Sequence, residues 1–198
     1  MESTWLPKPT LDGEKVTLRP FAAADVEVMS EMFTDPEVLK LTGSATTSSA
    51  IDGARPSPDD RTRQWYATRA DVDERLDLAI IDAASGELVG EVVLNEYDAN
   101  AASANFRIIV GPNGRGRGLG TEATRLILGY GFETIGLHRI DLGVYAFNPR
   151  AQHVYTQVGF VLEGTKRDAF AFDGEYVDEI LMSILSEEWS AHHGLPQS

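Results

Sequence analysis

Val16 and Leu18 alternate with Thr17 and Arg19, a pattern that predicts a strand. Three later segments, Leu76–Asp82, Glu87–Tyr97 and Ser103–Val110, are also predicted to be strands. The segments between them, Ala83–Gly86 and Asp98–Ala102, are short and turn-like, which favours antiparallel hairpins. Shorter strands are predicted at Lys15–Pro20, Arg139–Tyr145, Phe160–Glu163 and Glu179–Leu185.

Four segments are expected to form helices. Two precede the long strands, at Asp25–Phe33 and Arg61–Ala70. A third follows the glycine-rich loop after the third strand and carries its apolar residues on one face. The fourth opens with Asn148 and Pro149, because Asn caps helix N-termini and Pro is favoured in the first turn, and Gly159 suits its end.

Residues 42–60 interrupt this pattern. They are rich in Ser, Thr, Gly, Pro and Asp, and Ile51 is their only large apolar residue. Such a segment buries little surface, so a mobile loop is expected, either a passive connection or a lid. Antiparallel strands followed by a βαβ crossover predict a mixed sheet of about seven strands with about four helices. The chain is therefore expected to be a single α/β domain over residues 1–198, with its core at about 15–189.

Composition narrows the function classes. The 198 residues include 17 Lys and Arg against 31 Asp and Glu, a formal net charge of −14. Such acidity repels nucleic acid and anionic lipid, so neither partner is expected, whereas a cationic partner and simple solubility both stay open. The absence of cysteine excludes disulfides and a cysteine nucleophile, and the histidines lack metal-ligand spacing, so no metal is expected. No secretory signal or membrane-spanning stretch is visible, and the cytoplasm is the expected location.

The segment Gly111–Thr121 is the clearest candidate for a binding site. Glycine occupies alternate positions there, which permits positive φ and close approach of a ligand to the backbone. Because the loop leads into a helix, unpaired N–H groups and the helix dipole create an anion site. Residues 111–125 contain three Arg and one Glu, a local charge of +2 in an acidic chain. The loop is therefore predicted to bind phosphate groups.

Two common phosphate ligands fit this loop poorly. A P-loop is excluded because the loop has no lysine. The segment Gly118–Ala123 fits the looser G-x-G-x-x-A dinucleotide fingerprint, but that fingerprint should follow the first strand of a parallel βαβ unit, and here it follows hairpins. No acidic residue ends the next strand, where Tyr145 and Ala146 stand. A nicotinamide or flavin dinucleotide is therefore disfavoured.

Two motifs resemble the GNAT acetyltransferase superfamily. Arg115, Gly118 and Gly120 match its [RQ]-x-x-G-x-[GA] signature, and Gly116–Ala123 is similar to its ribosomal-protein N-acetyltransferase (RimJ/RimL-type) branch. The resemblance runs from about residue 16 to 189 and is loose between 42 and 75. A second block agrees with the same branch, at Asn148, Arg150-Ala151, Tyr155 and Gly159-Phe160.

The resemblance implies an acetyl-CoA-dependent N-acetyltransferase with a mixed, splayed central sheet. Acetyl-CoA is expected between the strands ending at Val110 and Tyr145, with its pyrophosphate on the loop amides. The cofactor-binding residues that the resemblance implies are Ile108, Ile109, Val110, Arg115, Gly116, Arg117, Gly118, Leu119, Gly120, Thr121, Asn148, Arg150 and Tyr155.

The resemblance also implies catalytic roles. In the family a tyrosine on the short helix protonates the departing thiolate, and Tyr155 stands at that position. A phenol with a pKa near ~10 is neutral at pH 7 and can donate a proton, although Tyr155 also lies on an apolar face that suits core packing. Asn148 is expected to cap its helix and contact the cofactor. The backbone N–H of Val110 or a close neighbour is the expected oxyanion donor.

The residue that acts as general base, accepting a proton from the attacking amine, is less clear from the sequence than the general acid. Many relatives carry a carboxylate on the strand before the loop, but Ser103–Val110 has none, and Asn105 occupies that neighbourhood. Glu91 lies on the adjacent predicted strand, on the face that also carries Val89 and Val93, where burial would raise its pKa. Glu91 is therefore the predicted base. A partly exposed Glu91, or a water chain without a protein base, are the alternatives.

The acceptor is expected to be a primary amine that attacks the thioester directly, either a protein or peptide N-terminus or a small amine. The acidity of the chain favours a basic or neutral acceptor.

A homodimer is one assembly that the chain could form. The alternative function is a catalytically silent acyl-CoA-binding regulatory module. The expected acidic contributors near the acceptor are Asp59, Asp60, Asp71, Asp73, Asp173, Glu175, Asp178 and Glu179.

Overall fold

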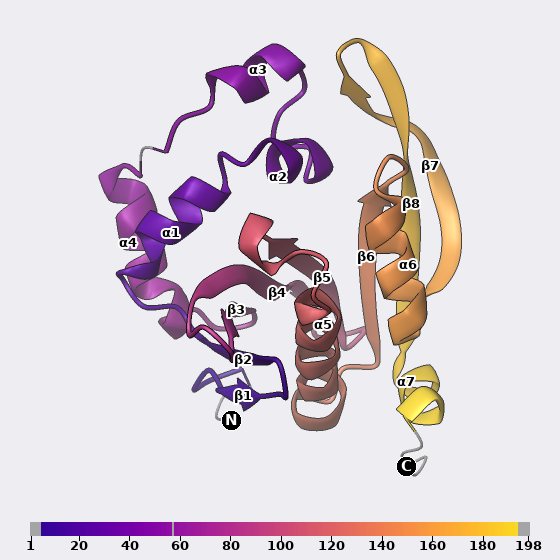
Figure 1. Ribbon diagram of the computed structural model, residues 1–198. Coiled ribbons are helices and arrows are strands. Elements are labelled where there is room, and N and C mark those ends of the chain that lie inside the picture. Colours follow the sequence, from indigo (N-terminus) through magenta and orange to yellow (C-terminus); the bar gives the residue numbers. More distant parts are fainter. Residues whose placement is uncertain (1–4, 57, 194–198) are drawn as a thin grey trace.

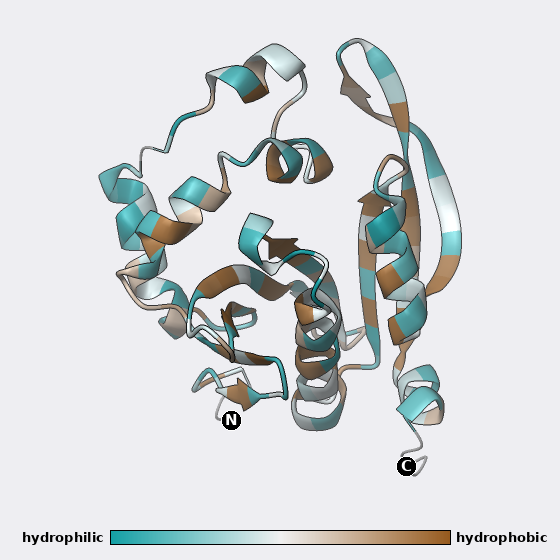
Figure 2. Cartoon of the chain, in the orientation of Figure 1, coloured by the Kyte–Doolittle hydropathy of each residue, from teal (hydrophilic) through white to brown (hydrophobic). Residues whose placement is uncertain are grey.

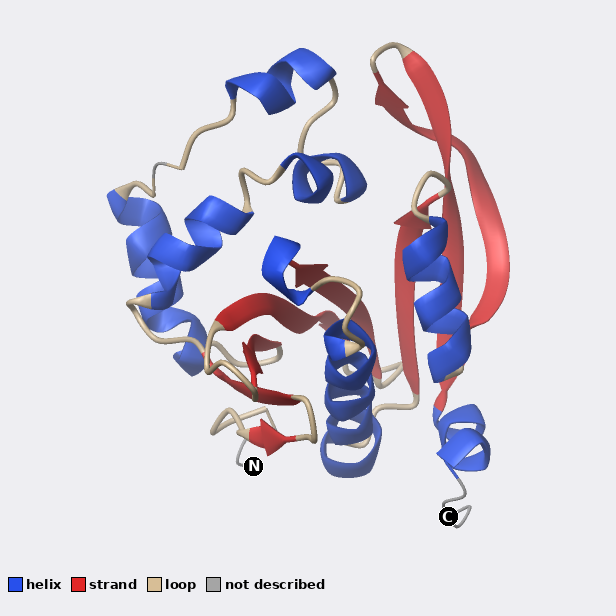
Figure 3. Cartoon of the chain, viewed as in Figure 1, coloured by secondary structure: helices blue, strands red, loops and turns tan. Residues whose placement is uncertain are grey.

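A single eight-stranded sheet forms the centre of the protein (Figures 1 and 3). The computed structural model describes residues 5–56 and 58–193. The strand order is β1-β2-β3-β4-β5-β6-β8-β7, and every neighbouring pair is antiparallel except β5 and β6. The strands are β1 (Leu11–Asp12), β2 (Val16–Pro20), β3 (Leu76–Asp82), β4 (Leu88–Asp98), β5 (Ser103–Val110), β6 (Arg139–Tyr145), β7 (Val161–Phe172) and β8 (Glu175–Leu185).

The parallel pair of strands divides the sheet into two halves. β5 and β6 are paired only from Ser103, opposite Arg139, to Asn105, opposite Asp141. Beyond Asn105, β5 stays paired with β4 up to Val110, whereas β6 stays paired with β8. The two strands therefore diverge, which confirms the predicted mixed and splayed sheet.

The described residues form seven α-helices, of which α5 and α6 pack on one face of the sheet and α1 and α4 on the other. The core of one face contains apolar residues of α5 together with Leu78 and Ile80 of β3. The other face contains residues of α1 and α4 together with Ala79 of the same strand. This separation follows from strand geometry, because successive side chains point to opposite faces. The helices are α1 (Asp25–Met32), α2 (Pro36–Leu41), α3 (Ser48–Gly53), α4 (Asp60–Thr68), α5 (Leu119–Tyr130), α6 (Pro149–Val158) and α7 (Ser186–His193).

Local sequence signals fix the ends of α5 and α6. Asn148 caps α6, with its Oδ1 accepting a hydrogen bond of 3.1 Å from the backbone N–H of Ala151. Gly159 ends this helix with a φ of 114°, and Gly118 precedes α5 with a φ of 80°. These caps confirm the predicted ends. Figure 2 shows apolar residues recurring along the strands and on α5, while α4 is mainly polar.

Three short helices were not predicted. α2 begins after Asp35, whose side chain caps it, with Pro36 in the first turn. α3 lies within the segment expected to be a loop, so that expectation is wrong for residues 48–53. α7 contains the histidine pair near the end of the chain, and the ring of His193 stacks on Trp189 at 3.7 Å. Six to eight residues give little periodicity, and tertiary contacts decide such segments.

The last two strands are longer than predicted. Asp173 and Gly174 form the turn between them, with positive φ angles of 49° and 84° that suit a two-residue hairpin. This turn reaches across to the start of α3, because Ser48 N donates to Asp173 Oδ1 at 2.8 Å and Asp173 N donates to Thr46 O at 2.9 Å. The hairpin tip and α3 therefore connect the two halves above the opening in the sheet (Figure 1).

Among the described residues, no helix is long and apolar enough to cross a membrane.

Candidate active site

A cleft of about 800 Å³ lies where β5 and β6 diverge. Backbone and side chains of β5 from Asn105 to Val110 form one wall, and β6 with parts of β7 and β8 forms the opposite wall. The glycine-rich loop and the first turns of α5 and α6 also line it. All cofactor-binding residues implied by the resemblance line this cleft except Arg117 and Leu119. Arg117 pairs with Asp82 at 2.7 Å instead, and Leu119 packs in the core.

The glycine-rich loop brings backbone close to this cleft. Gly116 and Gly118 have φ angles of 72° and 80°, which side chains disfavour. A Cβ at Gly114 would lie 2.7 Å from Val110 Cγ1, so this glycine lets the loop fold against the end of β5. The first N–H groups of α5 have no acceptor within the helix and are available to bind an anion. The loop therefore fits a diphosphate held mainly by backbone amides.

The open edge of β5 provides a further donor. Gly111 N donates to Val89 O of β4 at 2.8 Å. Successive N–H groups of a strand point to opposite sides, so the N–H of Val110 points away from β4 and toward the cleft. This orientation matches the oxyanion donor expected at Val110.

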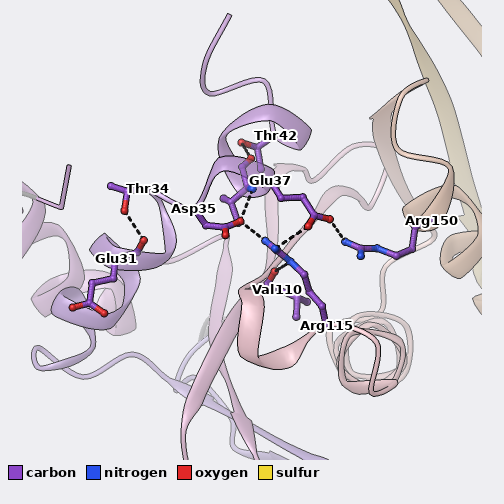
Figure 4. Close-up of polar contacts among 9 residues, drawn as sticks. Glu31, Thr34, Asp35, Glu37, Thr42, Val110, Arg115 and Arg150 are labelled. Carbon is purple, nitrogen blue, oxygen red and sulfur yellow. Dashed lines mark hydrogen bonds and ion pairs between the residues drawn. The ribbon is translucent and has the colours of Figure 1, made fainter. Parts of the chain in front are cut away.

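The arginines at the mouth of the cleft are paired with carboxylates of α2 and its cap (Figure 4). Arg115 contacts Asp35 Oδ1 at 2.5 Å and Glu37 Oε2 at 2.9 Å, and its Nε donates to Val110 O at 3.0 Å. The other oxygen of Glu37 lies 2.5 Å from Arg150 of α6. Partial burial alone would raise the pKa of Asp35, but hydrogen bonds from Arg115 and from backbone N–H groups lower it overall. Glu37 therefore links α2 to both halves of the site.

Tyr155 is packed in the core and also lines the cleft. Its ring meets Phe106 edge-on at 6.0 Å and Phe160 at 5.8 Å, and only 8% of the residue is exposed. The residue also lines the cleft. Burial raises the pKa of the phenol above its ordinary value, so the hydroxyl is a neutral proton donor at pH 7. Core packing and a position in the cleft are thus compatible for this residue.

Glu91 is buried, but it lies behind the cleft rather than in it. Its strand neighbours are Ala79 and Ile109, on the face covered by α1 and α4. The expectation that Val89 shares this face is wrong, because a bulge opposite Ile80 and Ile81 turns Val89 into the core beside α5. Glu91 is 4% exposed and does not line the cleft.

A buried group of charges surrounds Glu91. Arg69 of the turn after α4 pairs with Asp77 of β3, which also accepts two hydrogen bonds from Arg75. Burial raises the pKa of Glu91 to about 7, the positive charge of Arg69 opposes the rise, and the negative charge of Asp77 adds to it. The predicted burial and direction of the pKa shift are confirmed. Direct contact with a ligand in the cleft is not possible from this position.

Sequence reasoning missed most carboxylates that line the cleft. Of the acidic residues expected near the acceptor, only Glu179 lies there among the described residues. Asp173 instead accepts a hydrogen bond from Ser48 N, and Asp59 caps α4. The missed carboxylates are Glu96 of β4, Asp141 of β6 and Glu163 of β7. Alternation with the buried Ile140 and Leu142 could have placed Asp141 on this wall.

Comparison with known proteins decides the family. The family profile described as an acetyltransferase (GNAT) domain matches residues 15–161. The chain belongs to the GNAT acetyltransferases. The predicted family is thereby confirmed, and members of this acyltransferase family use acetyl-CoA.

The similar proteins include enzymes acting on small amines. The spermidine N(1)-acetyltransferase of Escherichia coli K12 is 36% identical over 111 residues, which cover 56% of this chain and 60% of that protein. YdaF of Bacillus subtilis, a candidate ribosomal N-acetyltransferase, is 26% identical over 89% of this chain and 94% of its own length. The crystal structure of the spermidine N-acetyltransferase of Vibrio cholerae with CoA and spermine is 26% identical with a TM-score of 0.74, covering 89% of this chain and 99% of that one.

Proposed function

We propose that this GNAT member transfers an acetyl group from acetyl-CoA to a small, cationic primary amine. The observation that carries the proposal is the continuous cleft from the N-terminal amides of α5, through the opening between β5 and β6, to a wall bearing carboxylates. The partial match to spermidine acetyltransferases supports a small amine. The similarity to YdaF keeps a protein N-terminus as the second candidate acceptor, and a homodimer stays a prediction.

The cofactor supplies an activated acetyl thioester. We propose that the amides of Gly116–Thr121 hold its diphosphate and that the N–H of Val110 stabilises the oxyanion formed during attack. The hydroxyl of Tyr155 donates a proton to the leaving sulfur. Asn148 caps α6 and also lines the cleft. This position supports the proposal that its side chain contacts the cofactor.

Glu91 is proposed to take up the proton lost by the attacking ammonium. Its pKa of about 7 suits this exchange at neutral pH. Because Glu91 lies behind Ile109, the proton must reach it through intervening groups such as water and not by direct contact.

Cofactor binding gives the first test. Acetyl-CoA or CoA at about 100 times its Kd should stabilise the fold by about 2.7 kcal/mol. For a domain of this size the melting temperature should rise by roughly 5–10 °C, and NADH should cause no shift. An equal shift with NADH would contradict the proposed cofactor. A shift with CoA but no CoA release with any amine would support a silent acyl-CoA-binding module instead.

Glu37 gives a second test, at the mouth of the cleft. The variant Glu37→Gln removes the negative charge that pairs with both Arg115 and Arg150. Arg150 is then available for phosphate, and Arg115 keeps only its pair with Asp35. We expect the KM for acetyl-CoA to fall about fivefold, with the effect lost at high salt.

Glu31→Gln is the matched control, because it makes the same charge change on α1, where the side chain points away from the arginines (Figure 4). A higher KM in Glu37→Gln would instead mean that Glu37 orients the arginines for the cofactor.

A further inference from the structure

Glu179 lines the wall of the cleft that is formed by β6 and β8. Glu179 is paired with Tyr145 across the two strands, and its side chain extends over Gly143 two residues away. A Cβ on Gly143 would collide with Glu179 Oε1. The glycine therefore gives this carboxylate room to lie flat in the cleft.

The partner of Glu179 is an alkylammonium group of the protein itself. Lys166 of β7 lies directly across from it, with 2.9 Å between Nζ and Glu179 Oε2. Both residues line the cleft. The Lys166 side chain is 59% exposed, and an ion pair with such an exposed, flexible lysine contributes little stability, so another ammonium can replace it at small cost.

The other carboxylates of this wall are held more firmly. Glu163 accepts two hydrogen bonds of 2.6 Å from Arg139 and one of 2.8 Å from Ser183, and these contacts lower its pKa to about 2. Asp141 accepts a hydrogen bond of 3.0 Å from Asn105 at the base of the opening. Of these three carboxylates, Glu179 is the one whose partner, the exposed side chain of Lys166, is most easily displaced.

We propose that Glu179 binds a second ammonium group of the acceptor, in the place that Lys166 Nζ occupies. The proposal rests on the proposed function and narrows its acceptor to linear diamines and polyamines in preference to monoamines. Lys166 is itself an ammonium on a four-carbon chain, so its contact displays the chemistry that such an acceptor would use. Val38 and Leu41 of α2, which also line the cleft, offer apolar contacts for the intervening methylene groups.

Comparing an acceptor that has two or more amines with a monoamine tests this subsite. With putrescine or spermidine, Glu179→Gln should lower kcat/KM about tenfold by raising KM, while kcat/KM for butylamine should change less than about twofold. Lys166→Met removes the internal competitor, so it should lower the KM for the diamine and leave that for butylamine unchanged. Glu175→Gln is the matched control, because it removes one charge from the same strand outside the cleft.

A direct binding measurement separates this proposal from the proposed function. Spermidine binding to the CoA-saturated protein, measured by calorimetry, should weaken about tenfold in Glu179→Gln and tighten in Lys166→Met. If spermidine binding weakens in Glu179→Gln and tightens in Lys166→Met, but no amine is turned over, the subsite stands and the proposed function fails. Equal losses for diamine and monoamine, or no change in spermidine binding in Glu179→Gln, would overturn the subsite.

Discussion

Replacing Tyr155 by phenylalanine is expected to lower kcat about 100-fold or more and to leave acetyl-CoA binding nearly unchanged. The substitution removes a buried hydroxyl but keeps the ring that packs against Phe106 and Phe160. Loss of a general acid costs about 10²–10⁴ in rate, whereas the lost packing is small. Turnover with a saturating amine and the Kd for CoA measure the two effects separately.

The control is Tyr130→Phe. Tyr130 is a partly buried tyrosine of α5 whose pKa is also raised by burial, but it does not line the cleft. It should keep its normal turnover. A Tyr155→Phe variant with unchanged kcat would leave Tyr155 with a packing role only.

Replacing Glu91 by glutamine is expected to stabilise the protein at pH 8 and to have little effect at pH 5. The folded state raises the pKa of Glu91 from 4.5 to about 7, so between these pH values it holds a proton that the unfolded chain has lost. The free energy of unfolding therefore falls as pH rises through this window. At about 1.4 kcal/mol per pKa unit, the cost of Glu91 above pH 7 is about 3 kcal/mol.

Glutamine cannot ionise, so the free energy of unfolding of the variant should not fall as the pH rises from 5 to 8. Its melting temperature at pH 8 should exceed that of the parent protein by roughly 6–12 °C, with little difference at pH 5. Glu87→Gln, an exposed position just before β4, is the control and should show no such pH dependence. A melting difference that is the same at both pH values would contradict the raised pKa.

The same variant tests the proposed base. If Glu91 takes up the proton, kcat at pH 8 should fall about 100-fold, and the rise in rate near pH 7 should disappear. A variant that gains stability at pH 8 while keeping the parent pH–rate profile would remove Glu91 from the mechanism and leave it as a buried structural residue.

The strands, the main helices and the cofactor loop could be predicted because their signals are local. Alternation of apolar residues matches the buried positions of β5 and β6, whereas β3 and β4 are runs that are buried on both faces. Asn148 with Pro149, and the glycines before α5, fix helix ends through the conformations of a few adjacent residues. The glycine-rich loop predicted to bind an anion lies in the same short segment, so its position before α5 could be expected without the rest of the chain.

The charged contacts at the mouth of the cleft depended on distant parts of the chain. Arg115 and Arg150 look free in the sequence, but Glu37 reaches them across 78 and 113 residues. No local pattern reports such a pair, because it exists only once α2 is packed over the loop. The charge of the loop is therefore positive in the sequence and balanced in the fold.

The sequence by itself determined the family, the order of the main elements and most of the residues around the glycine-rich loop that line the cleft, because these are encoded in short, consecutive motifs. Only the tertiary structure decided the environment of the titratable groups. One bulge in β3 and β4 placed Glu91 and Val89 on opposite faces, and the divergence of β5 from β6 opened the wall that carries Glu179. Side-chain alternation reverses with each inserted residue, and burial depends on which elements cover a face, so neither can be counted from the chain alone.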